Sequence, residues 1–265
     1  MRLLFLGDVV GRVARNRVLQ RLPEMRQEWR LDGVVINVEN AAGGFGVTAE
    51  IADAFFAGGA DVLTTGNHVW DKREIIGYIE GEPRLLRPHN MAEGTPGSGL
   101  VTVELANGGR LAVANLITNL FMAENMPVFP VLEEVLAKAM LGKTADALIL
   151  DIHGEATSEK LALGLVADGR ASLVVGTHTH IPTADTRILP AGTAYQTDAG
   201  MCGDYQSVIG MQAEAAIARF TGASAPRLSV ALGEPTLNGV LVETDDSSGL
   251  AISVEAIREG GVLGG

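Results

Sequence analysis

The feature that most constrains the fold of this chain is a repeated pattern in which short apolar runs are followed at once by metal-binding side chains. The runs occupy residues 3–6, 34–38, 62–66, 147–152 and 173–177. The side chains that follow them are those of Asp8, Glu39, Asn40, Asn67, His68, His153, His178 and His180. Short apolar runs bounded by glycine or polar residues indicate buried strands. Because open α/β sheets gather their chemistry at the carboxyl ends of strands, we predict that these residues meet in one polynuclear metal site.

The segments between these runs have helical periodicity, which places the chain in the α/β class. Residues 13–29 put Leu22 and Met25 on one helical face, and residues 49–57 follow Thr48, which suits a helix N-cap. Strands that alternate with helices indicate a largely parallel sheet with right-handed crossovers. Further helices are predicted at residues 131–141, from residue 157, and at residues 211–220, and further strands at residues 100–105, 111–114, 186–189, 230–232, 239–244 and 250–254. We therefore predict a four-layer α/β/β/α sandwich and, since no internal repeat or linker is visible, a single domain over residues 1–265.

Composition excludes several classes of protein. With 20 Lys and Arg against 32 Asp and Glu, the formal net charge is −12, which argues against a long nucleic-acid duplex as a partner. A pair of bound cations would reverse that sign locally, so a small phosphorylated ligand stays compatible with it. The single cysteine, Cys202, leaves no internal disulfide and no cysteine-cage zinc or iron–sulfur site, as suits a reducing compartment. No apolar segment is long enough to span a membrane, and the N-terminal one is too short for a signal peptide, so we expect a cytoplasmic protein without membrane association.

Glu39 and Asn67 have the properties that a paired-metal site requires. Only a carboxylate can bridge two cations and offset part of their repulsion, so Glu39 is the candidate bridging ligand. Asn67 offers a neutral oxygen, and Gly66 permits the tight turn that delivers it. His68 would then stand beside the ions as a free imidazole that can donate or accept a proton. The alternatives are an exposed loop carboxylate for Glu39 and, for Asn67 and His68, a cap on the next helix.

Histidine supplies most of the remaining candidates. In His178-Thr179-His180, a turn directly after a strand can aim both imidazoles inward, one toward each metal, although a solvated loop could have the same sequence. His153 follows an apolar strand, where a hydrogen-bonded core histidine is the alternative. His89 has no preceding strand and is left out as a surface or supporting residue. Oxygen and imidazole donors without thiolate suit iron, manganese or zinc, and paired metals about 4 Å apart clamp and activate phosphoryl groups.

The ordered motifs of the chain resemble those of the calcineurin-type metallophosphoesterases. They are Gly7-Asp8, Gly66-Asn67-His68, His153 alone after a strand, and Gly176-Thr177-His178-Thr179-His180. Two positions depart from that superfamily: Val10 stands where its first motif has histidine, and Glu39-Asn40 replaces its usual bridging aspartate. With these departures the chain resembles the YmdB-like branch along essentially its whole length. The segments that carry this likeness are residues 7–12, 37–44, 153–160 and 197–203.

The resemblance implies a fold, a metal site and an activity. The fold would be the metallophosphoesterase sandwich, and its site would hold two di- or trivalent transition-metal ions, iron first and manganese next. One ion would be held by Asp8, Asn40 and His180 and the other by Asn67, His153 and His178, with Glu39 bridging them and His68 as the catalytic proton donor. The activity would be hydrolysis of small phosphodiesters, 2′,3′-cyclic nucleotides to 3′-nucleotides, by attack of a metal-activated hydroxide.

Two other functions stay open at this point. One is a metal-stabilised regulatory or scaffold protein, against which His68 argues, since a structural site needs ligands but no uncoordinated acid. The other is a phosphatase that acts on protein or RNA, which would need a wide cleft. We expect a small phosphodiester substrate, with RNA-derived ligands among the candidates, and a homo-oligomer. Apolar residues of segment 120–130 either cover the site or form an interface, and they are Phe121, Met122, Met126, Val128 and Phe129.

Overall fold

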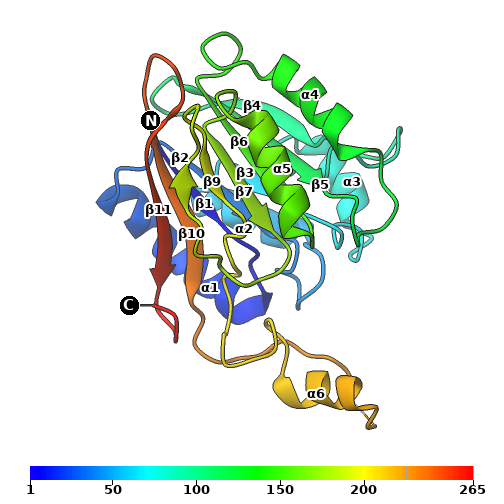
Figure 1. Ribbon diagram of the computed structural model, residues 1–265. Helices are drawn as coiled ribbons and strands as arrows, with labels where there is room; N and C mark the ends of the chain where they lie inside the picture. Colours follow the sequence, from blue (N-terminus) through cyan, green and yellow to red (C-terminus); the bar gives the residue numbers. More distant parts are fainter. Residues whose placement is uncertain (225, 265) are drawn as a thin grey trace.

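The computed structural model describes residues 1–224 and 226–264, and their strands form two sheets (Figure 1). The first sheet has the order β11-β10-β1-β2-β3, with β1 (Arg2–Leu6), β2 (Gly33–Asn37), β3 (Val62–Thr64), β10 (Leu237–Thr244) and β11 (Ala251–Glu259). The second has the order β4-β5-β6-β7-β9-β8, with β4 (Leu100–Glu104), β5 (Arg110–Ile117), β6 (Ala147–His153), β7 (Leu173–Thr177), β8 (Arg187–Ile188) and β9 (Ala194–Gln196). Strands β1, β2 and β3 are parallel, as are β5, β6, β7 and β9, whereas β4, β8, β10 and β11 pair antiparallel.

Helices cover the outer face of each sheet. Those on the first sheet are α1 (Gly11–Glu28), α2 (Ala49–Ala57) and α3 (Ile75–Gly81), and those on the second are α4 (Val128–Lys138) and α5 (Thr157–Ala167). Between the sheets lies a further apolar layer that includes Phe5, Val113 and Ile149. The layers therefore run helix, sheet, sheet, helix, which confirms the predicted α/β/β/α sandwich. One more helix, α6 (Ala213–Thr221), projects from the sandwich at the bottom of Figure 1.

The apolar runs form strands because both faces of each strand are covered. In β1, Leu4 and Leu6 face the helical layer, and Leu3 and Phe5 face the other sheet, and all four are fully buried. A strand with one solvated face would instead alternate apolar and polar residues. Within the described residues, none of the helices has both the length and the apolar character that crossing a membrane requires.

Local departures from the sequence prediction have local causes. The strand predicted at residues 230–232 is wrong: only Val230 makes a β-bridge, to Met211, and Leu232 is 62% exposed. Helix α3 and strand β9 are absent from the prediction because their 7 and 3 residues are too few to show a period. Helix α4 begins three residues earlier than predicted, since Pro130 is tolerated in the first turn of a helix.

Candidate metal centre

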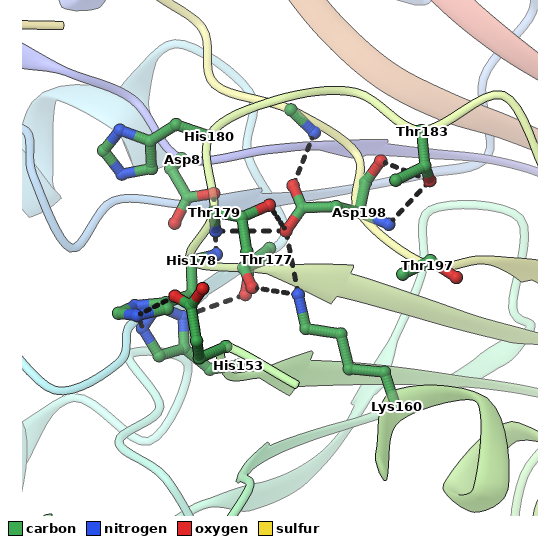
Figure 2. Close-up of polar contacts among 12 residues, drawn as sticks. Asp8, His153, Lys160, Thr177, His178, Thr179, His180, Thr183, Thr197 and Asp198 are labelled. Carbon is green, nitrogen blue, oxygen red and sulfur yellow. Dashed lines mark hydrogen bonds and ion pairs between the residues drawn. The ribbon is translucent and has the colours of Figure 1, made fainter. Parts of the chain in front are cut away.

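The residues predicted as ligands follow or end parallel strands, and the structure brings them to one place. Asp8 follows β1, Glu39 and Asn40 follow β2, Asn67 follows β3, His153 ends β6, and His178 and His180 follow β7. The first three strands belong to one sheet and the last two to the other. The site therefore lies where the carboxyl ends of both sheets meet, and Figure 2 shows Asp8, His153, His178 and His180 gathered there.

One group of donor atoms surrounds the His153 ring. His153 Nε2 lies 2.9 Å from Asn67 Oδ1 and 3.2 Å from Glu39 Oε2. The same nitrogen lies 3.1 Å from His178 Nδ1. Four donor atoms from four segments of the chain thus converge on one point.

The other nitrogen of His153 shows why this convergence favours a metal. His153 Nδ1 lies 2.9 Å from the Thr177 hydroxyl, and that hydroxyl donates its own proton to the buried Asp151 carboxylate at 2.7 Å. The hydroxyl must therefore accept from Nδ1–H, which leaves Nε2 as a lone pair. The Nε2 lone pair then lies next to the Asn67 and Glu39 oxygens with no hydrogen atom between them. A bound cation is the group that stabilises such a cluster of lone pairs.

A second group of donors shares Glu39 with the first. It consists of Asp8, Glu39 and His180, whose donor atoms all lie within 4.8 Å of one another. His180 Nδ1 donates to the Ile209 carbonyl at 2.9 Å, so its Nε2 also keeps a lone pair. Because Glu39 belongs to both groups, it occupies the position that a bridging carboxylate would take.

Two buried oxygen atoms reinforce this reading. Among the described residues, neither Asp8 Oδ1 nor Asn40 Oδ1 has a hydrogen-bond partner. The amide of Asn40 is held by its nitrogen, which donates to the Gly44 carbonyl at 2.9 Å. An unpaired buried acceptor costs about 1–3 kcal/mol, and a cation would remove that cost. The donor set of carboxylate, amide oxygen and imidazole fits two ions such as iron, manganese or zinc.

Burial also sets the protonation of the candidate ligands. It raises the pKa of Asp8 to about 7 and holds the pKa of Glu39 well above its ordinary value. It lowers the pKa of His178 to about 4, and it holds the pKa values of His153 and His180 below the usual range. Neutral imidazoles keep the lone pair that a metal requires, and cations would offset the cost of burying two carboxylates.

Gly66 is needed for space rather than for a turn. A Cβ atom at this position would lie 2.1 Å from Glu39 Oε2 and 2.3 Å from His153 Nε2. A tight turn does begin at Gly66, whose carbonyl accepts from the Val69 N–H at 3.3 Å, but the φ angle of Gly66 lies outside the left-handed region, so the turn by itself does not require glycine. Glycine is required because any side chain would enter the cluster of donor atoms.

His68 stands beside the donor groups without joining either of those found in the described chain. Its Nδ1 lies 2.9 Å from Asp71 Oδ2, and its ring packs edge to face on Phe45 with centroids 5.0 Å apart. The alternative role of His68 and Asn67 as a helix cap is wrong, because α3 begins only at Ile75. The His68 imidazole is therefore partly exposed, and its Nδ1 is hydrogen-bonded to Asp71, whereas its Nε2 has no hydrogen-bond partner among the described residues.

A cavity of about 390 Å³ opens at the site. Its polar lining includes Glu39, Asn40, His68, Glu155, His178, Thr179 and His180, and its apolar lining includes Phe45, Ile209, Met211 and Leu228. In the described part of the chain, segment 120–130 contributes nothing to this lining, and Phe121 is 84% exposed. That segment therefore does not cover the cavity.

Comparison with known proteins places this arrangement in a family. Residues 4–257 match the family model described as YmdB-like protein. The chain belongs to the YmdB-like family. It is 47% identical over 257 residues to the 2′,3′-cyclic-nucleotide 2′-phosphodiesterase of Bacillus subtilis (strain 168), and the match covers 97% of this chain and 96% of that relative.

Two solved structures are similar to this YmdB-like chain, each with a TM-score of 0.90. One is a hypothetical protein from Thermus thermophilus, 37% identical, with 99% of this chain and 100% of that chain covered. The other is a novel phosphatase from Mycoplasma pneumoniae, 33% identical, with 98% and 93% covered. These matches confirm the predicted family and the metallophosphoesterase type of sandwich.

Sequence reasoning missed several residues of the YmdB-like site. Phe45, Asp71 and Ile209 lie in loops and do not directly follow any of the five apolar runs. Only the spacing of three residues between His68 and Asp71 could have indicated that these two side chains meet. Asp151 is hidden inside an apolar strand, where it accepts hydrogen bonds from neighbouring side chains. His89, left out of the predicted site, does not line the cavity.

Proposed function

We propose that this protein is a dinuclear-metal phosphodiesterase that hydrolyses 2′,3′-cyclic nucleotides to 3′-nucleotides. The observation that carries the proposal is the sharing of Glu39 by two groups of donors, with His68 beside them and outside both. A purely structural metal site would have no use for an uncoordinated imidazole in its cavity. The substrate follows the name of the Bacillus subtilis relative, at 47% identity.

The donor groups suggest which residues would hold the ions. Asp8, Asn40 and His180 would bind one ion, Asn67, His153 and His178 would bind the other, and Glu39 would bridge them. We propose iron as the metal, with manganese next, because four of the seven donors are hard oxygens, from Asp8, Glu39, Asn40 and Asn67. When bound, such a pair supplies Lewis-acid chemistry for phosphoryl transfer.

His68 would protonate the leaving oxygen. Hydrolysis of a 2′,3′-cyclic phosphate to a 3′-nucleotide breaks the bond to the 2′ oxygen, which leaves as a poorly stabilised alkoxide unless an acid donates a proton. Asp71 accepts from His68 Nδ1 and so directs the second nitrogen, Nε2, to that task. Asp71 is therefore proposed as the residue that orients the acid.

The cavity favours a small nucleotide over a macromolecule. Its volume of about 390 Å³ lies within the range of roughly 300–1,000 Å³ that is typical of small-ligand sites. A phosphate at the donor groups would leave the nucleoside beside the apolar wall of Phe45, Ile209 and Met211. Phosphatases that act on protein or RNA need a more extended surface than this.

The test is an assay of purified, metal-reconstituted protein against three kinds of substrate: 2′,3′-cyclic nucleotides, linear dinucleotides and phosphomonoesters. We expect the highest kcat/KM for the cyclic nucleotides, with a 3′-nucleotide as the product. Faster hydrolysis of phosphomonoesters, or no turnover of any cyclic nucleotide at full metal loading, would overturn the proposal.

A further inference from the structure

Two segments that resemble the family motifs, residues 153–160 and 197–203, contain a pair of residues with no role in the chemistry above. Lys160 lies in α5 and Asp198 lies just after β9. The Lys160 ammonium donates to Asp198 Oδ2 at 2.8 Å, and both side chains are only 1% exposed. Figure 2 shows this ion pair beside the candidate ligands, to the right of His178.

Both members of the pair form hydrogen bonds to the residues on either side of His178. Lys160 Nζ also donates to the carbonyl of Thr177 at 2.7 Å, one residue before His178. Asp198 Oδ2 accepts from the Thr179 N–H at 3.1 Å and from the Thr179 hydroxyl at 2.8 Å, one residue after it. The ion pair therefore holds the backbone on each side of this histidine.

The backbone of the turn that contains His178 and His180 has an uncommon conformation, which the surrounding residues must stabilise. His178 has a φ of 97° and His180 a φ of 67°, both in the left-handed region that residues with a side chain rarely adopt. Such conformations persist only where the surroundings hold them in place. Thr179 is the residue between them, and each histidine belongs to a different donor group.

A buried ion pair does not by itself make a fold more stable. Removing two charges from water costs about as much free energy as their attraction returns, so an apolar pair of equal volume often serves the fold as well. What the apolar pair cannot supply is a charged acceptor for both Thr179 donors and a donor for the Thr177 carbonyl. These are the hydrogen bonds that fix the turn.

We propose that Lys160 and Asp198 are positioning residues, which clamp Thr179 and so hold His178 and His180 at the separation that two metal ions require. This inference rests on the metal ligands of the proposed function. Neither residue touches the reacting atoms, and both act through their hydrogen bonds to Thr177 and Thr179.

The test compares metal affinity in matched variants. Thr179→Val removes the hydroxyl but keeps the shape and the backbone N–H, Thr179→Ser keeps the hydroxyl, and Lys160→Met removes the charge. The control is Arg26→Met, which breaks the Arg26–Asp61 ion pair between α1 and the loop before β3, outside the donor groups. Each protein is titrated with Mn²⁺ against a competing chelator, and thermal unfolding of the metal-free form is recorded separately.

We expect Thr179→Val and Lys160→Met to lose roughly 10–100-fold in affinity for at least one ion, as is usual when a residue that supports a metal ligand is removed. Thr179→Ser should restore most of that affinity, and Arg26→Met should lower the unfolding temperature without changing metal affinity. Wild-type affinity for both ions in Thr179→Val and Lys160→Met would overturn the proposal and leave the pair as part of the fold only. If Lys160→Met does not fold, the Thr179 pair of variants decides.

Failure of the proposed function has a different signature. A wild-type protein that binds two ions but turns over no cyclic nucleotide refutes the substrate, while the titrations still test the clamp. A wild-type protein that binds no pair of ions refutes both.

Discussion

His68 Nδ1 lies 2.9 Å from Asp71 Oδ2, three residues further along the same loop, and the His68 and Phe45 rings pack edge to face. These contacts hold the imidazole through one nitrogen and through its packing on Phe45, so that only Nε2 is left to act in the cavity that His68 lines. An acid held in this way loses little orientational freedom when the substrate arrives. The contrast between His68 and the candidate ligands can be tested directly.

Replacing His68 by alanine should reduce turnover and leave the metals in place. General acid catalysis contributes roughly 10²–10⁴-fold, and kcat on 2′,3′-cyclic nucleotides should fall by that order. The loss should shrink for p-nitrophenyl esters, whose leaving group departs without a proton. Elemental analysis run beside the kinetics separates the outcomes: loss of metal would make His68 a ligand, and full activity would move the acid elsewhere, with Glu155, which also lines the cavity outside the donor groups, the next residue to test.

Replacing Asp71 by asparagine should have a smaller effect of the same kind. The amide keeps the shape but weakens the hydrogen bond that orients His68. In the double variant His68→Ala/Asp71→Asn, kcat should equal that of His68→Ala alone, because the two residues act as one unit. An additional loss in the double variant would show that Asp71 acts independently of His68.

Glu39→Ala should cost the protein both metals. Glu39 lies in each donor group, and without it two cations would face each other with no shared anion. We expect close to two transition-metal ions per wild-type chain by elemental analysis, and far fewer in the variant. A single ion per chain, unchanged by the substitution, would rule out the bridging role.

Gly66→Ala should also empty the site, although it adds only one methyl group. That carbon would lie 2.1 Å from Glu39 Oε2, which is much closer than any real contact. The control is Gly77→Ala in the exposed part of α3, where an added Cβ meets nothing within 4 Å. Calorimetry should find the control unchanged or stabilised by about 0.5–1 kcal/mol, with metal content intact. Normal metal content in Gly66→Ala would contradict the close approach of these donors.

Iron or manganese should support more turnover than zinc. Asp8, Glu39, Asn40 and Asn67 all offer oxygen, which suits these ions. The measurement is kcat/KM of one batch of metal-free protein reconstituted with each metal to equal occupancy. Highest activity with zinc would count against this choice of metal.

The sequence predicted the candidate ligands because strand ends are local signals. A run such as residues 34–38 marks a buried strand, and the carboxyl ends of parallel strands meet, so Glu39 and His153 could be brought together in advance. The second sheet and the layer order followed from the alternation of elements. Residues 230–232 had the composition of a strand, but only Val230 forms a β-bridge, to Met211, and the partners that a segment meets are a property of tertiary structure alone.

Residues that support the ligands could not be predicted in the same way. Lys160 and Asp198 are 38 residues apart in the sequence, and no local pattern in either segment predicts that they are in contact. Asp151 stands inside an apolar strand, and its acceptance of the Thr177 proton depends on register between β6 and β7. The sequence indicates that position 66 requires glycine, but the steric cause depends on Glu39 Oε2 and His153 Nε2, which two other strands bring close to it.

The position of β1 in its sheet has a consequence for biosynthesis. β1 is paired on one side with β2 and on the other with β10, where Leu4 stands opposite Leu241, 237 residues further along the chain. At a translation rate of about 5–20 residues per second, a nascent chain holds that edge unpaired for on the order of 10–50 s. An unpaired edge of this kind invites pairing with other chains, which makes chaperone protection valuable during that interval. Gly7, which separates β1 from Asp8, donates its N–H to the Asn238 carbonyl of β10 at 3.1 Å, so the support of the segment that carries Asp8 is complete only once β10 has paired.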